Sequence, residues 1–140
     1  MSRSAVRGAV TDYLAANWTL SELVYQNTTT EPAVQSDGVL RPWVYVEVSY
    51  NNTAQWSIGE EPRTGNRWRE DGMVFFHMFT PAGAGLSVAD LHADTLIDLF
   101  KGLQLSPDIE FRDITSDIGG PGDDNGNYYR ISISVEWVRN

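Results

Sequence analysis

The sequence predicts a single α+β domain over residues 1–140, with a mixed or mainly antiparallel β-sheet packed against about two α-helices. Two segments, residues 4–16 and 88–101, carry apolar residues at helical spacing. Further segments are alternating or continuous apolar runs of strand length, residues 43–50, 73–80, 109–114 and 128–138. Residues 23–25 could add a short strand. With one more strand after residue 52, the order α-β-β-β-α-β-β favours one sheet with helices packed on it.

The first predicted helix covers residues 4–16. Its apolar residues Val6, Val10 and Leu14 recur every four positions and therefore share one face. Gly8 weakens the prediction, because glycine in a helix interior costs about 1 kcal/mol relative to alanine. We expect the apolar face to pack on the sheet.

The second predicted helix has a start and a stop signal. Ser87 can accept hydrogen bonds from the free N–H groups at the helix start, and Asp90 suits the positive end of the helix dipole. Gly102 follows the last turn, where a helix commonly ends. We expect a broad apolar stripe comprising Val88, Ala89, Leu91, Ala93, Leu96, Ile97, Leu99 and Phe100.

The strands differ in the faces that they are expected to bury. In residues 43–50, alternate valines share one face. Asn51-Asn52 is a turn signal, so residues 53–59 are expected to return as the partner strand of a hairpin. Residues 73–80 are almost continuously apolar, so both faces are expected to be covered. Residues 128–138 alternate and predict one buried face and one wetter face.

Composition excludes several classes of function. The chain has no cysteine, and so no disulfide, no thiolate nucleophile and no cysteine-based zinc site. A net charge of −9 argues against bulk electrostatic binding of nucleic acid. No apolar run approaches the roughly 20 residues that span a bilayer, and no secretory signal is evident. We expect a protein made and used in a cytoplasm, without a membrane or a specific nucleic acid sequence as partner.

Several residues could carry chemistry, but they form no complete constellation. His77 and His92 lack the i, i+4 pairing of a zinc-binding helix and are expected to be structural or surface groups. Asp90, Asp94 and Asp98 recur at helical spacing and are expected to form a solvated helix face. The sequence therefore assigns no catalytic, cofactor-binding or metal-binding residue.

Two glycine-rich stretches are expected to be structural. Residues 81–85 precede a helix, where backbone N–H groups can bind phosphate, but they lack the Lys-Ser/Thr of a P-loop. Residues 119–127 resemble one copy of a calcium-binding repeat, which needs neighbouring copies to complete its ion sites. We expect a hinge and an ordinary loop, with no metal or other cofactor.

The best functional candidate is an arginine- and tryptophan-rich loop. Three of the ten cationic residues, Arg63, Arg67 and Arg69, lie within seven positions around Trp68. Arginine and tryptophan are enriched in the hot spots of protein interfaces. We expect Arg63, Arg67, Trp68 and Arg69 to form an interface at the tip of a loop or hairpin over residues 60–71. The alternative is a loop whose Trp68 folds back on the core.

One long motif carries a family resemblance. Residues 71–102 read DGMVFFHMFTPAGAGLSVADLHADTLIDLFKG: a strand, a P-x-G-x-G hinge and a helix that ends in Leu-Phe-Lys-Gly. Together with WVYVEVSY, IEFRDI and YYRISISVEWVRN, this motif resembles the phage tail terminator, or tail completion, proteins. Non-contractile-tailed phages and phage-like gene transfer agents both use such proteins.

The resemblance implies a function without enzymatic activity. Proteins of this family assemble into a ring of six copies, a homo-hexamer, that caps the head-proximal end of the tail tube. The ring ends tail polymerisation and joins the tail to the head. The implied partners are further copies of the chain, the major tail tube protein and a head-side connector or stopper protein. The implied location is the host cytoplasm during assembly and then the head–tail junction of the particle.

A second hypothesis is a small ligand-binding or hydrolytic α+β domain that uses the acidic helix or the glycine loops. A metal- or ligand-dependent rise in melting temperature would favour it, because a ligand that binds only the folded state stabilises that state. Ring formation in solution or on tail tubes would favour the structural hypothesis.

Overall fold

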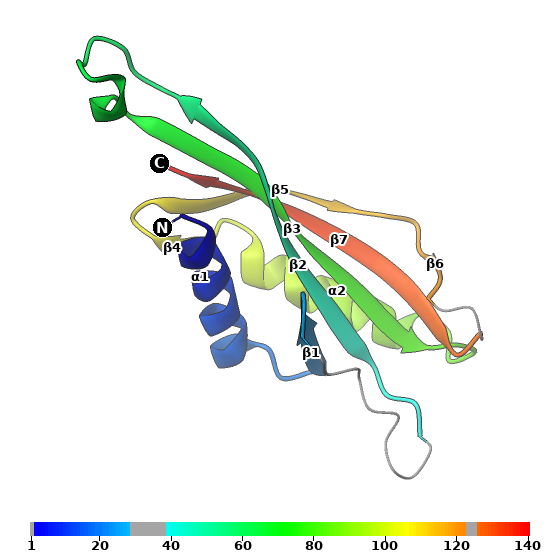
Figure 1. Cartoon of the computed structure of the whole chain (residues 1–140). Coiled ribbons are helices and arrows are strands. Elements are labelled where there is room, and N and C mark those ends of the chain that lie inside the picture. Colours follow the sequence, from blue (N-terminus) through cyan, green and yellow to red (C-terminus); the bar gives the residue numbers. More distant parts are fainter. Residues whose placement is uncertain (1, 29–38, 123–125) are drawn as a thin grey trace.

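The computed structural model describes residues 2–28, 39–122 and 126–140. These residues form one mixed sheet and two α-helices, which confirms the predicted α+β class (Figure 1). In chain order the elements are α1 (Ser2–Asn17), β1 (Glu22–Tyr25), β2 (Trp43–Gln55), the 3-10 turn η1 (Arg63–Gly65), β3 (Trp68–Pro81), α2 (Ser87–Phe100), β4 (Gln104–Ser106), β5 (Ile109–Ser116), β6 (Gly120–Pro121) and β7 (Tyr128–Arg139).

The sheet has the strand order β1-β2-β3-β7-β5-β4, and β6 pairs with the start of β7. Strand β1 runs parallel to β2, and every other pair is antiparallel, so the sheet is mixed as predicted. The three long strands β2, β3 and β7 form its centre. Their register places Val46 opposite Phe76, and Phe76 opposite Ile133, in one buried row.

Both helices cover the same face of the sheet. The predicted apolar face of α1, with Val6, Val10 and Leu14, is buried in the core. Phe100 of α2 lies 5.1 Å from the Phe76 ring, measured between ring centroids. The helices are also joined to each other, because the Tyr13 hydroxyl donates a 2.7 Å hydrogen bond to the Leu99 carbonyl. The core therefore lies between one helical layer and one face of the sheet.

Strands β2 and β3 extend beyond the helices as a long hairpin, whose residues 52–71 we call the arm (Figure 1). The predicted turn at Asn51-Asn52, with residues 53–59 returning along 43–50, is wrong. Strand β2 continues to Gln55 and keeps β3 as its partner throughout. The extra residue is accommodated as a bulge between Tyr50 and Asn52. The ladder with β3 therefore overrides the local turn preference, and the chain reverses at residues 63–65.

The second face of β3 is not covered by a helix, so the prediction of two covered faces is wrong for the described residues. Val74, Phe76 and Met78 are buried under the helices, whereas the alternate residues are only half-buried. We call this second side of the sheet the open face; its central residues are Trp43, Tyr45, Glu47, Phe75, His77, Phe79 and Ser132. Aromatic side chains cover each other there, and the Trp43 and Phe79 rings stack at 4.2 Å.

Helix α2 differs from its prediction at its start and in its buried stripe. The residue at the N-cap is Leu86, and no side chain caps the helix, so the predicted capping by Ser87 is wrong. The buried stripe contains His92, whereas Leu91 is exposed. The buried stripe has a spacing of three and four residues and comprises Ala89, His92, Leu96 and Phe100. Leu91 lies on another side of the helix and does not face the core.

Candidate functional site

The arginine- and tryptophan-rich loop lies at the far tip of the arm, where its own hydrogen bonds fold it. The Trp56 N–H donates to the Arg67 carbonyl at 2.7 Å, and the Arg67 N–H donates to Ser57 Oγ at 2.7 Å. The buried side chain of Asn66 accepts a 3.2 Å bond from the Glu60 N–H. The tip is therefore an ordered structure of its own, apart from the hydrophobic core.

Two of the predicted interface arginines brace the arm. The Arg69 guanidinium carbon lies 3.9 Å from the centre of the Trp56 ring, a cation–π geometry. Its Nε donates a 2.8 Å bond to Oδ1 of Asn140. Arg63 donates to Oε1 of Gln55 from Nη2 at 2.8 Å and from Nε at 3.3 Å. Both side chains keep an exposed surface at the tip.

Trp68 does not fold back on the core. It lies at the start of β3, is 38% exposed and pairs with Gln55 across the hairpin. Successive residues of a strand point to opposite sides, so Trp68 and Arg69 point to opposite faces of the arm. The four predicted residues are therefore brought to one tip but are divided between its two faces.

Two exposed apolar residues of the arm were missed as site residues. Trp56 is 58% exposed and Ile58 is 91% exposed, and both precede the turn at the tip. The sequence placed them in a strand predicted to pair with residues 43–50, and their exposure was not considered. The available signal was the alternation of Trp56 and Ile58 with Gln55 and Ser57, which gives one side of the segment an apolar character.

The open face carries a serine–histidine–carboxylate row. His77 Nε2 lies 2.6 Å from Oε1 of Glu47, and His77 Nδ1 lies 2.7 Å from Oγ of Ser132. Acyl transfer by such a row also needs paired N–H donors aimed at a developing oxyanion. Ser132 lies within β7, and its N–H is used by Oδ1 of Asp117 at 2.9 Å. The row links side chains of β2, β3 and β7 across the open face, and the Ser132 N–H is not available as an oxyanion donor.

In the part of the chain that the structure describes, the acidic helix and the glycine loops bring no metal-binding group together. Asp90, Asp94 and Asp98 are exposed, and Asp98 pairs with Lys101 at 3.6 Å. No three His, Asp or Glu residues within residues 2–28, 39–122 and 126–140 gather into a metal-binding group. Gly83 adopts a φ of +83°, a conformation that favours glycine, so the hinge uses it for backbone geometry. Residues 123–125 of the second glycine loop lie outside the described residues.

Surfaces rather than a reaction centre distinguish the described part of the molecule. It has a helix-covered face, an aromatic open face and an arm that presents arginine and tryptophan. The chain is thus a small α+β protein with three distinct surfaces.

The family model for the phage tail terminator protein matches residues 5–137, and the chain belongs to this family. It is therefore a structural component of a phage tail, in contact with tail and head components of the particle. No curated protein matches the chain. In the described residues, no helix combines the length and apolar character needed to cross a membrane.

Solved structures show that the fold is shared. Twenty-nine chains match. One of them, whose name states no function, aligns with a TM-score of 0.68 at 20% sequence identity. The alignment covers 100% of this chain and 96% of that chain, so the likeness extends over the whole fold.

Proposed function

We propose that the protein forms a closed ring that caps the head-proximal end of the tail tube. The ring ends tube polymerisation and joins the tail to a head-side connector or stopper protein. By family resemblance the ring contains six copies. The observation that carries the proposal is the arm, which extends beyond the helix-covered body of a chain in the tail terminator family and exposes an arginine- and tryptophan-rich tip.

The distribution of charge supports contacts between unlike surfaces. Residues 90–140 hold ten acidic and four basic residues, whereas the arm tip holds Arg63, Arg67 and Arg69. A basic tip and an acidic body can pair between neighbours in a head-to-tail contact. A head-to-tail contact generates a closed ring when its rotation closes.

The proposed partners are further copies of the chain, the major tail tube protein and the head-side connector. The proposed interface residues are Arg63, Arg67, Trp68 and Arg69. Neither a membrane nor a specific nucleic acid sequence is a proposed partner. The protein is proposed to assemble in the host cytoplasm and to remain at the head–tail junction of the finished particle, without enzymatic activity.

The test replaces Arg63, Arg67 and Arg69 by Glu and images the resulting particles by negative-stain electron microscopy. These substitutions remove the contacts of Arg63 with Gln55 and of Arg69 with Trp56 but leave the hydrophobic core untouched, so they should change the melting temperature little and should block tail completion. A matched control reverses charge on the body through Lys101→Glu and Arg112→Glu, and should complete its tails.

Two outcomes would contradict the proposal. If the variant with Glu at positions 63, 67 and 69 forms normal tails at physiological salt, the arm is not the interface. A wild-type protein labelled along the whole tail, or absent from particles, would overturn the capping function itself.

A further inference from the structure

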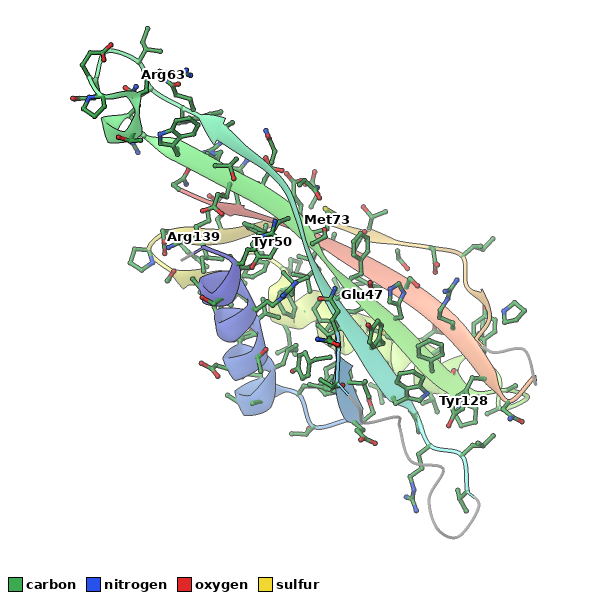
Figure 2. The ribbon with its side chains drawn as sticks, viewed as in Figure 1. Glu47, Tyr50, Arg63, Met73, Tyr128 and Arg139 are labelled. Carbon is green, nitrogen blue, oxygen red and sulfur yellow. The ribbon has the colours of Figure 1, made fainter. Side chains whose placement is uncertain are left out.

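An apolar groove lies at the opposite end of the sheet from the arm tip. It has a volume of about 550 Å³ and is formed where β3 ends, α2 begins and β7 starts. Its lining includes Pro81, Ala82, Leu86, Pro121, Tyr128 and Tyr129. Figure 2 shows Tyr128 at this end and Arg63 at the other.

The groove is preformed by backbone hydrogen bonds. The Ala82 N–H donates to the Asn127 carbonyl at 2.9 Å, and the Gly122 N–H donates to the Tyr128 carbonyl at 2.8 Å. On its rim, Leu86 is 51% exposed and continues the apolar lining of the groove. The groove therefore offers an apolar surface that needs little reorganisation to receive a partner.

The arm tip exposes apolar groups that match the apolar lining of the groove. Trp56 and Ile58 project as exposed apolar groups from a segment held by its own hydrogen bonds. A rigid apolar anchor loses little conformational freedom on binding. Large side chains such as tryptophan dominate the energetics of many protein interfaces when they enter a pocket.

The tip and the groove cannot meet within one chain. Strand β3 alone has 14 residues between the tip end and the groove end, and at about 3.3 Å per residue it spans about 45 Å. The tip and the groove lie at opposite ends of an elongated subunit, so only other molecules can cover them. If the partner is a second copy, each contact leaves one tip and one groove free, so the contact repeats until a ring closes.

We propose that the arm tip of one subunit docks into this groove of the next copy, with Trp56 and Ile58 packed against Leu86 and Tyr128. The inference rests on the proposed ring and specifies the contact that builds it. Charge favours a copy as the occupant. Asp90, one helical turn after Leu86, is exposed and lies outside the ion pairs of the described residues. It can receive the exposed Arg67 of the incoming tip.

The experiment uses the absence of native cysteine in the sequence. Subunits carrying Ile58→Cys and subunits carrying Leu86→Cys are co-expressed, assembled into particles and treated with a short bismaleimide. The mixture should give a covalent dimer, whereas each variant alone should stay monomeric on a denaturing gel. A chain carrying both substitutions should give a ladder that ends at the size of the ring. Both positions are exposed, so the substitutions should not change the melting temperature.

A matched control pairs Ile58→Cys with Lys101→Cys, an exposed position at the far end of α2, and should give no dimer. Rings visible on the tails without a cross-link in the Ile58/Leu86 mixture would overturn the docking while the proposed ring stands. Dimers from Ile58→Cys alone would mean that tips meet tips and would also overturn it. Particles that lack the protein would overturn the docking together with the proposed function.

Discussion

The indole of Trp137 lies directly against the backbone of Gly72, its partner in the β3–β7 ladder. A Cβ atom at position 72 would lie 2.6 Å from Cζ2 of Trp137 and would collide with the Ser49 carbonyl oxygen. Trp137 is fully buried, and the Tyr50 ring meets it edge-on at 5.0 Å. Glycine therefore lets the tryptophan close the core at the point where the arm leaves the body.

Gly72→Ala should lower the free energy of unfolding by about 1–3 kcal/mol, as overpacking of a filled core does. The Ser49 carbonyl is backbone and cannot rotate away, so relaxation is limited. Chemical denaturation of the purified protein measures the change. Gly8→Ala is the control, because a Cβ there meets nothing within 4 Å and should stabilise α1 by about 0.5–1 kcal/mol. Equal stability of Gly72→Ala and wild type would contradict the proposed close approach.

Asn66→Ala should loosen the arm tip without melting the core. The Asn66 side chain is buried and accepts the Glu60 N–H, so its loss leaves a donor without a partner. Hydrogen exchange at Glu60 should accelerate, while the thermal midpoint should change little, because the tip lies outside the core. Thr64→Ala, at an exposed position of the same turn, should leave exchange at Glu60 as in wild type. Unchanged protection in Asn66→Ala would show that other contacts hold the tip.

Stability should fall on acidification because of His92. Burial lowers the pKa of this side chain, whose Nδ1–H donates to the Val88 carbonyl at 2.9 Å. Below about pH 6.5 the unfolded chain binds a proton that the folded chain does not. The stabilisation present above the unfolded pKa is therefore lost as the pH falls toward the folded pKa, by at most about 1.4 kcal/mol per pH unit.

The measurement compares wild type with His92→Leu by denaturation between about pH 7 and pH 5. Wild type should lose stability more steeply, because the variant has no group to protonate at this position. Parallel curves would show that protonation of His92 does not oppose folding.

Metal ions should not change stability. The described residues hold no group of three potential metal ligands, and a ligand stabilises a protein only by binding its folded state. Adding a chelator or calcium should therefore leave the thermal midpoint unchanged within error. A rise of several degrees with calcium would contradict this prediction.

The sequence correctly predicted those elements in which the spacing of the apolar residues matches the face that the fold buries. The final strand is the clearest case, because Ile133, Val135 and Trp137 alternate with polar residues and are buried in the structure. The helix over residues 4–16 was found for the same reason. The very short strands β4 and β6 contain too few residues to carry a periodic signal.

Two of the errors in the strands have a common cause, because the local preference of a segment was considered without its neighbouring strand. Asn51-Asn52 has turn chemistry, but β3 supplies hydrogen-bond partners for a continuing strand. The apolar run of β3 was read as doubly buried, whereas aromatic neighbours such as Trp43 cover half of it. For the candidate site, composition located the tip, but only the register shows that Trp68 and Arg69 point to opposite faces.

The bulge between Tyr50 and Asn52 reverses which residues of β2 face the helices. Before it, even-numbered residues such as Val48 point toward the helices; after it, Asn52 pairs with Asp71, so even-numbered residues point to the opposite side. Trp56 thereby lies on the side of the arm where Arg69 stacks on it. A ladder without the bulge would instead pair Asn51 with Asp71 and would place Trp56 on the side of the arm opposite Arg69. The extra residue of the bulge thus decides which side of the arm carries Trp56.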